Sequence, residues 1–146
     1  MTFRRATVDD VRAIVELLAA DQLGATRDGG DLEPYERAFE AIDADPAHLL
    51  VVAEDGGEVV ATMQLSFLPG LARRGALRAQ IEGVRVRSDQ RGSGLGSELM
   101  AWAIDESRRR DCALVQLTSD KRRTDAHRFY ERLGFVSSHE GFKLSL

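Results

Sequence analysis

Apolar positions in the first third of the chain predict a strand followed by two helices. Residues 2–7 are expected to form the strand. The first helix is indicated by apolar residues at helical spacing, Val11, Ile14, Val15 and Leu18. Asp9 or Asp10 can cap its start, and it ends near residue 21. Pro34 suits the first turn of a second helix, which runs to about residue 44.

The stretch between these helices, residues 23–34, is the most loop-like part of the sequence. It contains Gly24, Gly29 and Gly30, and glycine is typical of turns and loops. We therefore expect it to be the most mobile region. Such a loop either carries substrate selection or simply connects two helices.

An antiparallel hairpin is predicted in the middle of the chain. Residues 48–54 and 58–68 have the length and apolar content of strands, and Asp55, Gly56 and Gly57 separate them. The two glycines can adopt the positive φ that a tight hairpin turn requires. Residues 69–78 should form a loop, and the central strand should begin at Gln80.

The spacing of apolar residues changes from strand to helix after the central strand. Ile81, Val84 and Val86 are apolar, β-branched residues suited to a strand, whereas Leu95, Leu99, Trp102 and Ala103 recur at helical spacing and predict a helix over residues 93–110. Residues 112–118 then predict a short strand that begins at Cys112, is buried on both faces and runs parallel to the central strand.

The end of the chain predicts one more helix and two strands. Residues 124–133 have a helical pattern, and Gly134 is a typical C-terminal stop. Residues 135–146 are expected to form a closing pair of strands around Glu140 and Gly141.

A glycine turn lies where the central strand gives way to the long helix. Gly92, Gly94 and Gly96 remove side chains there, and the first N–H groups of a helix have no internal partner, so they can bind an anion. Arg91 adds a positive charge. The turn therefore predicts a phosphate-bearing ligand.

Two common phosphate-binding motifs do not fit this turn. A nucleoside-triphosphate loop ends in Gly-Lys-Ser/Thr, whereas this turn continues as Gly96-Ser97-Glu98. A dinucleotide fingerprint needs G-x-G-x-x-G, but the glycines here fall as G-x-G-x-G. By itself the turn could also be an ordinary connection.

Two motifs together resemble those of the GNAT superfamily of N-acetyltransferases. One is R-x-x-G-x-G at residues 91–96, and the other is A-x-x-F-Y-E-x-x-G-F at residues 126–135. The resemblance implies a single N-acetyltransferase domain over residues 1–146 of the α/β (α+β) class. Its mixed, mostly antiparallel sheet would have about six or seven strands flanked by about four helices.

The resemblance implies acetyl-CoA as the co-substrate. Its pyrophosphate would lie on the glycine turn, and its pantetheine arm and acetyl carbonyl would lie along the central strand, which splays from its parallel neighbour. The residues implied in binding acetyl-CoA are Val84, Arg85, Val86, Arg91, Gly92, Ser93, Gly94, Leu95, Gly96 and Ser97.

Two residues are candidates for proton transfer. Tyr130 matches the family tyrosine that protonates the leaving thiolate, or it packs as a core aromatic beside Phe129 and Phe135. Glu82 would share a face with Val84 and Val86 unless a bulge intervenes. It is a candidate base or a ligand for the ammonium of the acceptor; alternatively, it forms an ion pair with an arginine such as Arg78 or Arg85.

Other ionisable residues carry weaker hypotheses. His139 and Glu140 either border the acceptor site or are solvated turn residues, and His127 is expected to be structural. Arg123 stands where many family members have an asparagine that contacts the pantetheine arm, so that contact is in doubt, although Lys121, Arg122 and Arg123 could meet coenzyme phosphates. No residue spacing indicates a metal site.

The distribution of charge favours a basic cofactor-binding half and an acidic N-terminal half. Residues 1–60 hold 14 acidic and 5 basic residues, and residues 61–146 hold 10 and 15, which gives the net charge of −4. An acidic half suits a cationic partner, or the solvated faces simply differ in composition. No basic run is interleaved with aromatic residues, so a nucleic-acid partner is not expected.

Composition further predicts a globular, cytoplasmic protein without a membrane span. Hydrophobic residues make up 43% of the 146 residues, and no run approaches the roughly 18 apolar residues of a spanning helix. Cys112 is the single cysteine, which excludes an internal disulfide. Whether the chain forms a homodimer stays open.

These observations predict transfer of an acetyl group to a primary amine by direct attack in a ternary complex. The acceptor would be a small-molecule or peptide amine, for example a polyamine, an aminoglycoside, an amino sugar or a lysine side chain. The alternatives are a non-catalytic module that binds acetyl-CoA as a regulatory signal, and a transferase of longer acyl groups, because the glycine turn binds the carrier and not the acyl chain.

Overall fold

The computed structural model describes residues 1–20 and 27–146. They form two compact units, Met1–Gln116 and Leu117–Leu146. Part of the stretch expected to be most mobile, including Gly24, lies outside the described residues. The strands are β1 (Thr2–Arg5), β2 (His48–Asp55), β3 (Glu58–Leu68), β4 (Arg78–Val86) and β5 (Leu114–Leu117).

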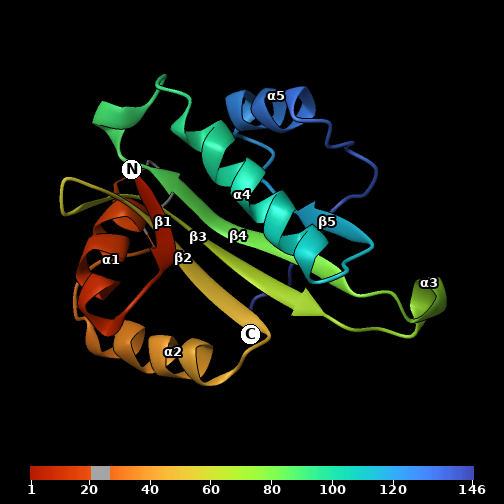
Figure 1. Cartoon of the computed structure of the whole chain (residues 1–146), viewed down its shortest axis with the longest axis horizontal. Helices are drawn as coiled ribbons and strands as arrows, with labels where there is room; N and C mark the ends of the chain where they lie inside the picture. The colour runs from red at the N-terminus through yellow and green to blue at the C-terminus, as the bar shows by residue number, and fades with distance from the viewer. Residues whose placement is uncertain (21–26) are drawn as a thin grey trace. The chain divides into compact units, whose positions relative to one another are not determined.

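The sheet has the order β1-β2-β3-β4-β5 (Figure 1), and its first four strands pair antiparallel. The predicted hairpin of β2 and β3 is confirmed, with Gly56 and Gly57 in its turn at φ of 57° and 83°. These positive angles are the conformations that glycine adopts without strain.

Hydrogen bonds fix the direction of β5 beside β4. The amide of Ala113 donates to the carbonyl of Leu77 (2.8 Å), and the side chain of Gln116 donates to that of Gln80 (2.9 Å). Both partners advance along the chain together, as in a parallel pair. The predicted parallel pairing is therefore supported. β5 is shorter than predicted and only half-buried, and Cys112 lies in the turn before it.

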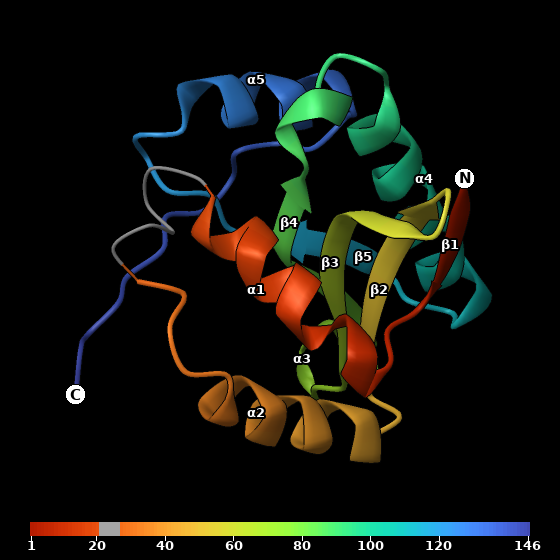
Figure 2. The same cartoon turned by 90° about the vertical axis from the view of Figure 1, so that its left-hand side faces the viewer.

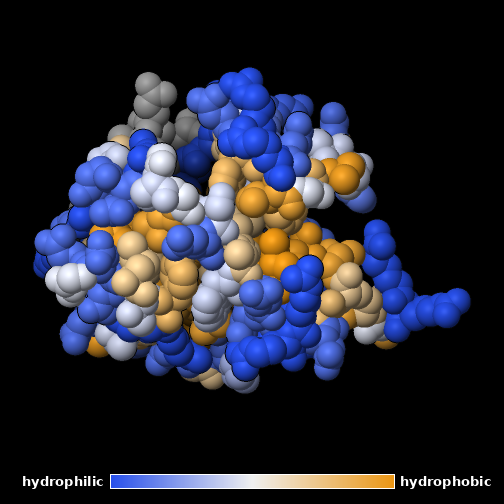
Figure 3. All heavy atoms as spheres, turned by 45° about the horizontal axis from the view of Figure 1, so that its top comes forward, coloured by the Kyte–Doolittle hydropathy of each residue, from blue (hydrophilic) through white to orange (hydrophobic). Residues whose placement is uncertain are grey.

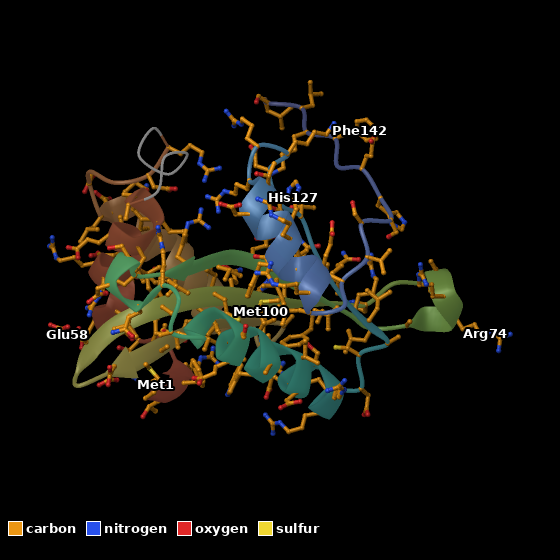
Figure 4. The ribbon with its side chains drawn as sticks, turned by 90° about the horizontal axis from the view of Figure 1, so that it is seen from above. Met1, Glu58, Arg74, Met100, His127 and Phe142 are labelled. Carbon is orange, nitrogen blue, oxygen red and sulfur yellow. The ribbon has the colours of Figure 1, made fainter. Side chains whose placement is uncertain are left out.

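Helices cover both faces of this sheet (Figure 2), with α1 and α2 on one side and α4 on the other. Because both faces are covered, consecutive residues of β2 and β3 are buried, as at residues 51–53 and 60–63. Met100 of α4, labelled in Figure 4, is fully buried. The helices of this unit are α1 (Val11–Ala19), α2 (Glu33–Ala44), α3 (Ala72–Gly75) and α4 (Leu95–Arg109), with 3-10 turns η1 (Val8–Asp10) and η3 (Ser88–Gln90).

The 3-10 helix η1, which leads into α1, is fixed by an ion pair and a capping box. Asp10 is buried, accepts a hydrogen bond from the backbone N–H of Thr7 (2.7 Å) and forms a salt bridge with Arg4 (2.8 Å). Arg4 also binds Glu54 on β2 (2.6 Å). The hydrogen bond from Arg4 holds the pKa of Asp10 below its usual range. Asp10 therefore connects the cap of this helix to the edge of the sheet.

The connection between β3 and β4 is a left-handed turn and not a plain loop. Arg73, Arg74 and Gly75 have φ of 57°, 60° and 72°. Arg74 points away from the sheet at the tip of this connection (Figure 4), and Leu71 beside it is 97% exposed. Two consecutive arginines in a region that favours glycine carry a conformational cost.

The second unit contains α5 (Thr124–Arg132), and Gly134 ends the helix at φ 98° as predicted. The predicted closing pair of strands is wrong: residues 135–146 form no strand, so the sheet of the described residues has five strands and not six or seven. Phe142, Leu144 and Leu146 alternate as strand residues do, but they are almost fully exposed. Alternation produces a strand only where a neighbouring strand supplies hydrogen bonds.

Hydrophilic residues cover much of the face shown in Figure 3, with hydrophobic residues between them. Charged residues make up 30% of the chain. Among the described residues, none of the helices is both long and apolar enough to cross a membrane.

Candidate functional site

A β-bulge interrupts β4 beside Glu82. Thr62 on β3 pairs with Arg85 and Gln64 pairs with Glu82, so two residues of β4, Gly83 and Val84, lie opposite one residue of β3. Gly83 has φ 63°, the left-handed conformation that the first residue of a glycine bulge adopts. This is the bulge that, as noted from the sequence, would change the face on which Glu82 lies.

The bulge changes which side chains share a face. Because directly paired residues point to the same side, Glu82 lies on the face of Arg85, Thr62 and Gln64. The expectation that Glu82 projects with Val84 and Val86 assumed an uninterrupted strand and is wrong. Val86 pairs with Ala61 and lies on the opposite face from Arg85.

Glu82 lines a cavity of about 150 Å³ on the α1 side of the sheet. Its carboxylate is the one titratable group in the described lining. Gly83 contributes no side chain to the cavity, and a Cβ there would contact Leu18 at 3.9 Å. A carboxylate set among apolar groups suits a primary ammonium ion. The lining residues are Ile14, Leu18, Leu50, Thr62, Met63, Gln64, Glu82 and Gly83.

Glu82 is hydrogen-bonded to an amide and not to an arginine. Its Oε1 accepts from Nε2 of Gln80 (2.6 Å), and Gln80 in turn accepts from Gln116. Within the described part of the chain Glu82 makes no ion pair with Arg78 or Arg85, so the ion-pair alternative is not supported. Sequence reasoning missed both glutamines, because only the pairing of β4 with β5 brings them together.

The glycine turn has the geometry of an anion site at the start of α4. Gly92 and Gly94 have φ of 81° and 88°, with open space where a Cβ would stand. The first helical hydrogen bond runs from the amide of Glu98 to the carbonyl of Gly94 (3.1 Å). The amides of Leu95, Gly96 and Ser97 precede it and have no acceptor inside the helix.

These residues fit the pyrophosphate of acetyl-CoA. Amides at a helix N-terminus and the helix dipole both favour negative charge. Two of the predicted contacts are engaged inside the protein: Arg91 donates from Nε to the carbonyl of Val86 (3.3 Å), and the hydroxyl of Ser93 donates to the carbonyl of Gln90. The backbone amides, more than these side chains, therefore form the cradle.

Arg87 supports this turn and was not predicted from the sequence. It donates to Glu58 at the hairpin turn (3.0 Å) and to both carboxylate oxygens of Asp89 (2.7 and 2.9 Å). The hydrogen bond from Arg87 holds the pKa of Asp89 below its usual range. Arg87 thus connects the residues before the glycine turn to the β2–β3 hairpin.

A second cavity, of about 170 Å³, lies at the end of β4. Val86, Arg87, Ser88 and Arg91 contribute to its lining together with α1 residues that include Glu16. The base of the glycine turn therefore faces α1 on this side of the sheet.

In the second unit, Tyr130 packs as an aromatic residue. Its ring meets Phe129 and Phe135 edge to face, at centroid distances of 5.2 and 6.0 Å. This is the arrangement expected of a core aromatic. It does not test the proton-transfer role of the Tyr130 hydroxyl, which stays a prediction.

The remaining ionisable candidates have local partners in the second unit. His127 binds the carbonyl of Asp120 (2.8 Å), as a structural residue would, and Arg122 pairs with the Asp120 carboxylate. His139 contacts Ser138 (2.6 Å) in an exposed segment and not in a hairpin. Among the described residues, no cluster of three or more His, Cys, Asp or Glu side chains could hold a metal ion.

Comparison with known proteins places the chain in a family. Residues 12–135 match the model of the acetyltransferase (GNAT) family. The chain is 31% identical to the aminoalkylphosphonate N-acetyltransferase of Salmonella typhimurium, over 98% of the chain and 90% of that protein. It is 33% identical to the glucosamine 6-phosphate N-acetyltransferase of Trypanosoma brucei brucei, over 62% of the chain and 59% of that protein.

A solved structure gives the same result for the fold. The crystal structure of a transcriptional regulator from Bacillus halodurans C-125 is 47% identical, covers 99% of both chains and has a TM-score of 0.96. The glycine turn at the start of α4, the mixed sheet and the family match agree. The chain belongs to the GNAT family and is an acetyl-CoA-dependent N-acetyltransferase.

Proposed function

We propose that the protein transfers the acetyl group of acetyl-CoA to the primary amine of a small molecule, by direct attack within a ternary complex. The observation that carries the proposal is the carboxylate of Glu82 on the wall of an apolar cavity beside the β4 bulge. Acetyl-CoA supplies the activated acetyl group, and the glycine turn would hold its pyrophosphate.

Glu82 and Tyr130 would then each carry out one of the two proton transfers. Glu82 takes a proton from the ammonium of the acceptor, which leaves a nitrogen lone pair able to attack a carbonyl carbon. The hydroxyl of Tyr130 donates a proton to the leaving thiolate sulfur as the carbon–sulfur bond breaks. Backbone groups of Val84, Arg85 and Val86 would orient the thioester by hydrogen bonding.

We further propose that the acceptor carries an anionic phosphonate or phosphate group besides its amine. The acceptors named for the Salmonella and Trypanosoma relatives both combine these groups. Arg85 supports the proposal here, because it is half-buried on the face of Glu82. Its Nη1 group donates a hydrogen bond to the carbonyl of Val84 (2.8 Å) at the bulge.

The test is release of CoA from acetyl-CoA with matched pairs of amines. We expect 2-aminoethylphosphonate and glucosamine 6-phosphate to exceed ethanolamine and glucosamine in kcat/KM by about tenfold, because a charge-assisted contact to Arg85 contributes to binding. The variant Arg85→Met should remove this preference, because kcat/KM should fall more for the two anionic amines than for ethanolamine and glucosamine.

Other outcomes separate the alternatives. A preference for spermidine would overturn the anionic acceptor and support the cationic acceptor that the acidic N-terminal half favours. Release with longer acyl-CoA donors only would indicate a different acyl group. Tight binding of acetyl-CoA without release for any amine would contradict catalysis and indicate a regulatory module, the role named for the Bacillus halodurans relative.

A further inference from the structure

Three side chains form a continuous hydrogen-bonded row from β5 to the carboxylate of Glu82. Nε2 of Gln116 donates to Oε1 of Gln80 (2.9 Å), and Nε2 of Gln80 donates to Oε1 of Glu82 (2.6 Å). The row crosses from one strand to the next at the parallel pair, next to the bulge. Residues 80, 82 and 116 all belong to the first unit.

The chemistry of the carboxylate sets the direction of this row. An ionised carboxylate only accepts hydrogen bonds, so Gln80 must present its NH2 group to Glu82. The carbonyl oxygen of Gln80 then points to Gln116, which must donate. The carboxylate thereby sets the orientation of the Gln80 amide, and the hydrogen bond from Gln116 to the Gln80 carbonyl oxygen stabilises that orientation.

We propose that Gln80 and Gln116 are positioning residues for Glu82; this inference rests on the proposed function. The bond to Oε1 holds the carboxylate in one rotamer and leaves Oε2 to take the proton from the acceptor. The arrangement suits both protonation states, because Oε1 still accepts from Gln80 when the proton is on Oε2.

A purely structural role does not explain the row. Glu82 is exposed and the bond between Gln80 and Glu82 is solvent-accessible. Exposed side-chain pairs contribute little to the free energy of unfolding. Fixing the orientation of a reacting group, in contrast, affects the rate directly, because small displacements reduce productive encounters.

The experiment compares Gln80→Met and Gln116→Met, which keep the side-chain length and remove the amide, with Gln116→Glu. We expect kcat to fall about fivefold in each methionine variant, as the loss of one hydrogen bond predicts. In Gln116→Glu the new acceptor turns the amide of Gln80 around, so its carbonyl faces Glu82. That variant should lose about tenfold or more.

Each change is repeated in a Glu82→Gln background. The matched control is Gln90→Met, because the Gln90 side chain has no hydrogen bond among the described residues. If the glutamines act through Glu82, they should have no further effect once Glu82 is changed. KM for acetyl-CoA should stay within about twofold in all variants, since binding of the carrier is not altered.

The outcomes separate this inference from the proposed function. Full activity in Gln80→Met and Gln116→Met, or additive losses in the Glu82→Gln background, would overturn the positioning role alone. Full activity in Glu82→Gln would overturn both the base and its positioning. Loss of melting temperature in proportion to activity would indicate a structural role and contradict the inference.

Discussion

Glu82 and Arg85 lie on the same face of the sheet although they are three positions apart along β4. In a regular strand, residues three apart point to opposite sides. The bulge at Gly83 and Val84 removes that difference and places a carboxylate and a guanidinium on the α1 side of the sheet. The acceptor side of the proposed reaction therefore depends on one glycine.

Replacement of Gly83 tests this dependence. Gly83→Ala forces a side chain into φ 63°, which costs about 1 kcal/mol, while its Cβ meets only Leu18 at ordinary contact distance. We expect kcat/KM for the amine to fall by more than the loss of folded protein accounts for, because the bulge determines on which face of the sheet Glu82 and Arg85 lie. Gly57→Ala is the control: it has φ 83° and open surroundings, and it should lower the melting temperature similarly with unchanged kinetics.

Arg87→Met should weaken the binding of acetyl-CoA without touching it directly. Arg87 ties the residues before the glycine turn to Glu58 and Asp89, so its loss should loosen the cradle of amides. Isothermal titration should show Kd for acetyl-CoA raised about threefold to tenfold, within the range of a lost positioning contact. Arg108→Met, which removes an exposed pair with Asp105, should leave Kd unchanged.

The capping box of η1, which precedes α1, should give stability that depends on pH. The pKa of Asp10 is lower in the folded protein than its ordinary value of 3.8, so its contribution is present above that value and is lost as pH falls. Asp10→Asn should cost about 1–3 kcal/mol at pH 7, the range for a buried charged hydrogen bond. Urea unfolding at pH 7 and pH 3 measures it: the difference from wild type should shrink at pH 3. Asp9→Asn, at the exposed neighbouring position, should change little at either pH.

The left-handed turn between β3 and β4 offers a stabilising substitution. Arg74→Gly removes a side chain from φ 60°, so it should raise the free energy of unfolding by about 0.5–1 kcal/mol. Thermal unfolding measures this gain. In contrast, Arg108→Gly in the last turn of α4 should lower the melting temperature. If Arg74→Gly lowers it as well, the left-handed turn between β3 and β4 stores no strain.

The sequence predicted the elements well where local signals decide them. The bounds of β3, the hairpin glycines and the end of α5 at Gly134 all follow from spacing and turn chemistry within a few residues of the chain. The glycine turn and the family were found in the same way. The single domain predicted over residues 1–146 stays a prediction, although the family match spans the boundary between the two units.

The features that were missed depend on pairing between distant segments. The bulge is a property of the register between β3 and β4, and Gly83 alone does not reveal it. Gln80 and Gln116 meet only because β5 lies beside β4. Phe142 and its alternating neighbours have the pattern of a strand, but a pattern cannot supply the partner that a strand needs.

The setting of Cys112 has a practical consequence for following the reaction. The thiol is half-buried in the turn before β5, and burial raises its pKa, so little of it is thiolate at neutral pH. An aromatic disulfide that releases a coloured thiolate when it reacts with free CoA can follow turnover. Cys112 is the one protein thiol that would also react with this reagent, and it should react slowly. Turnover of every variant above can therefore be recorded continuously against a low background.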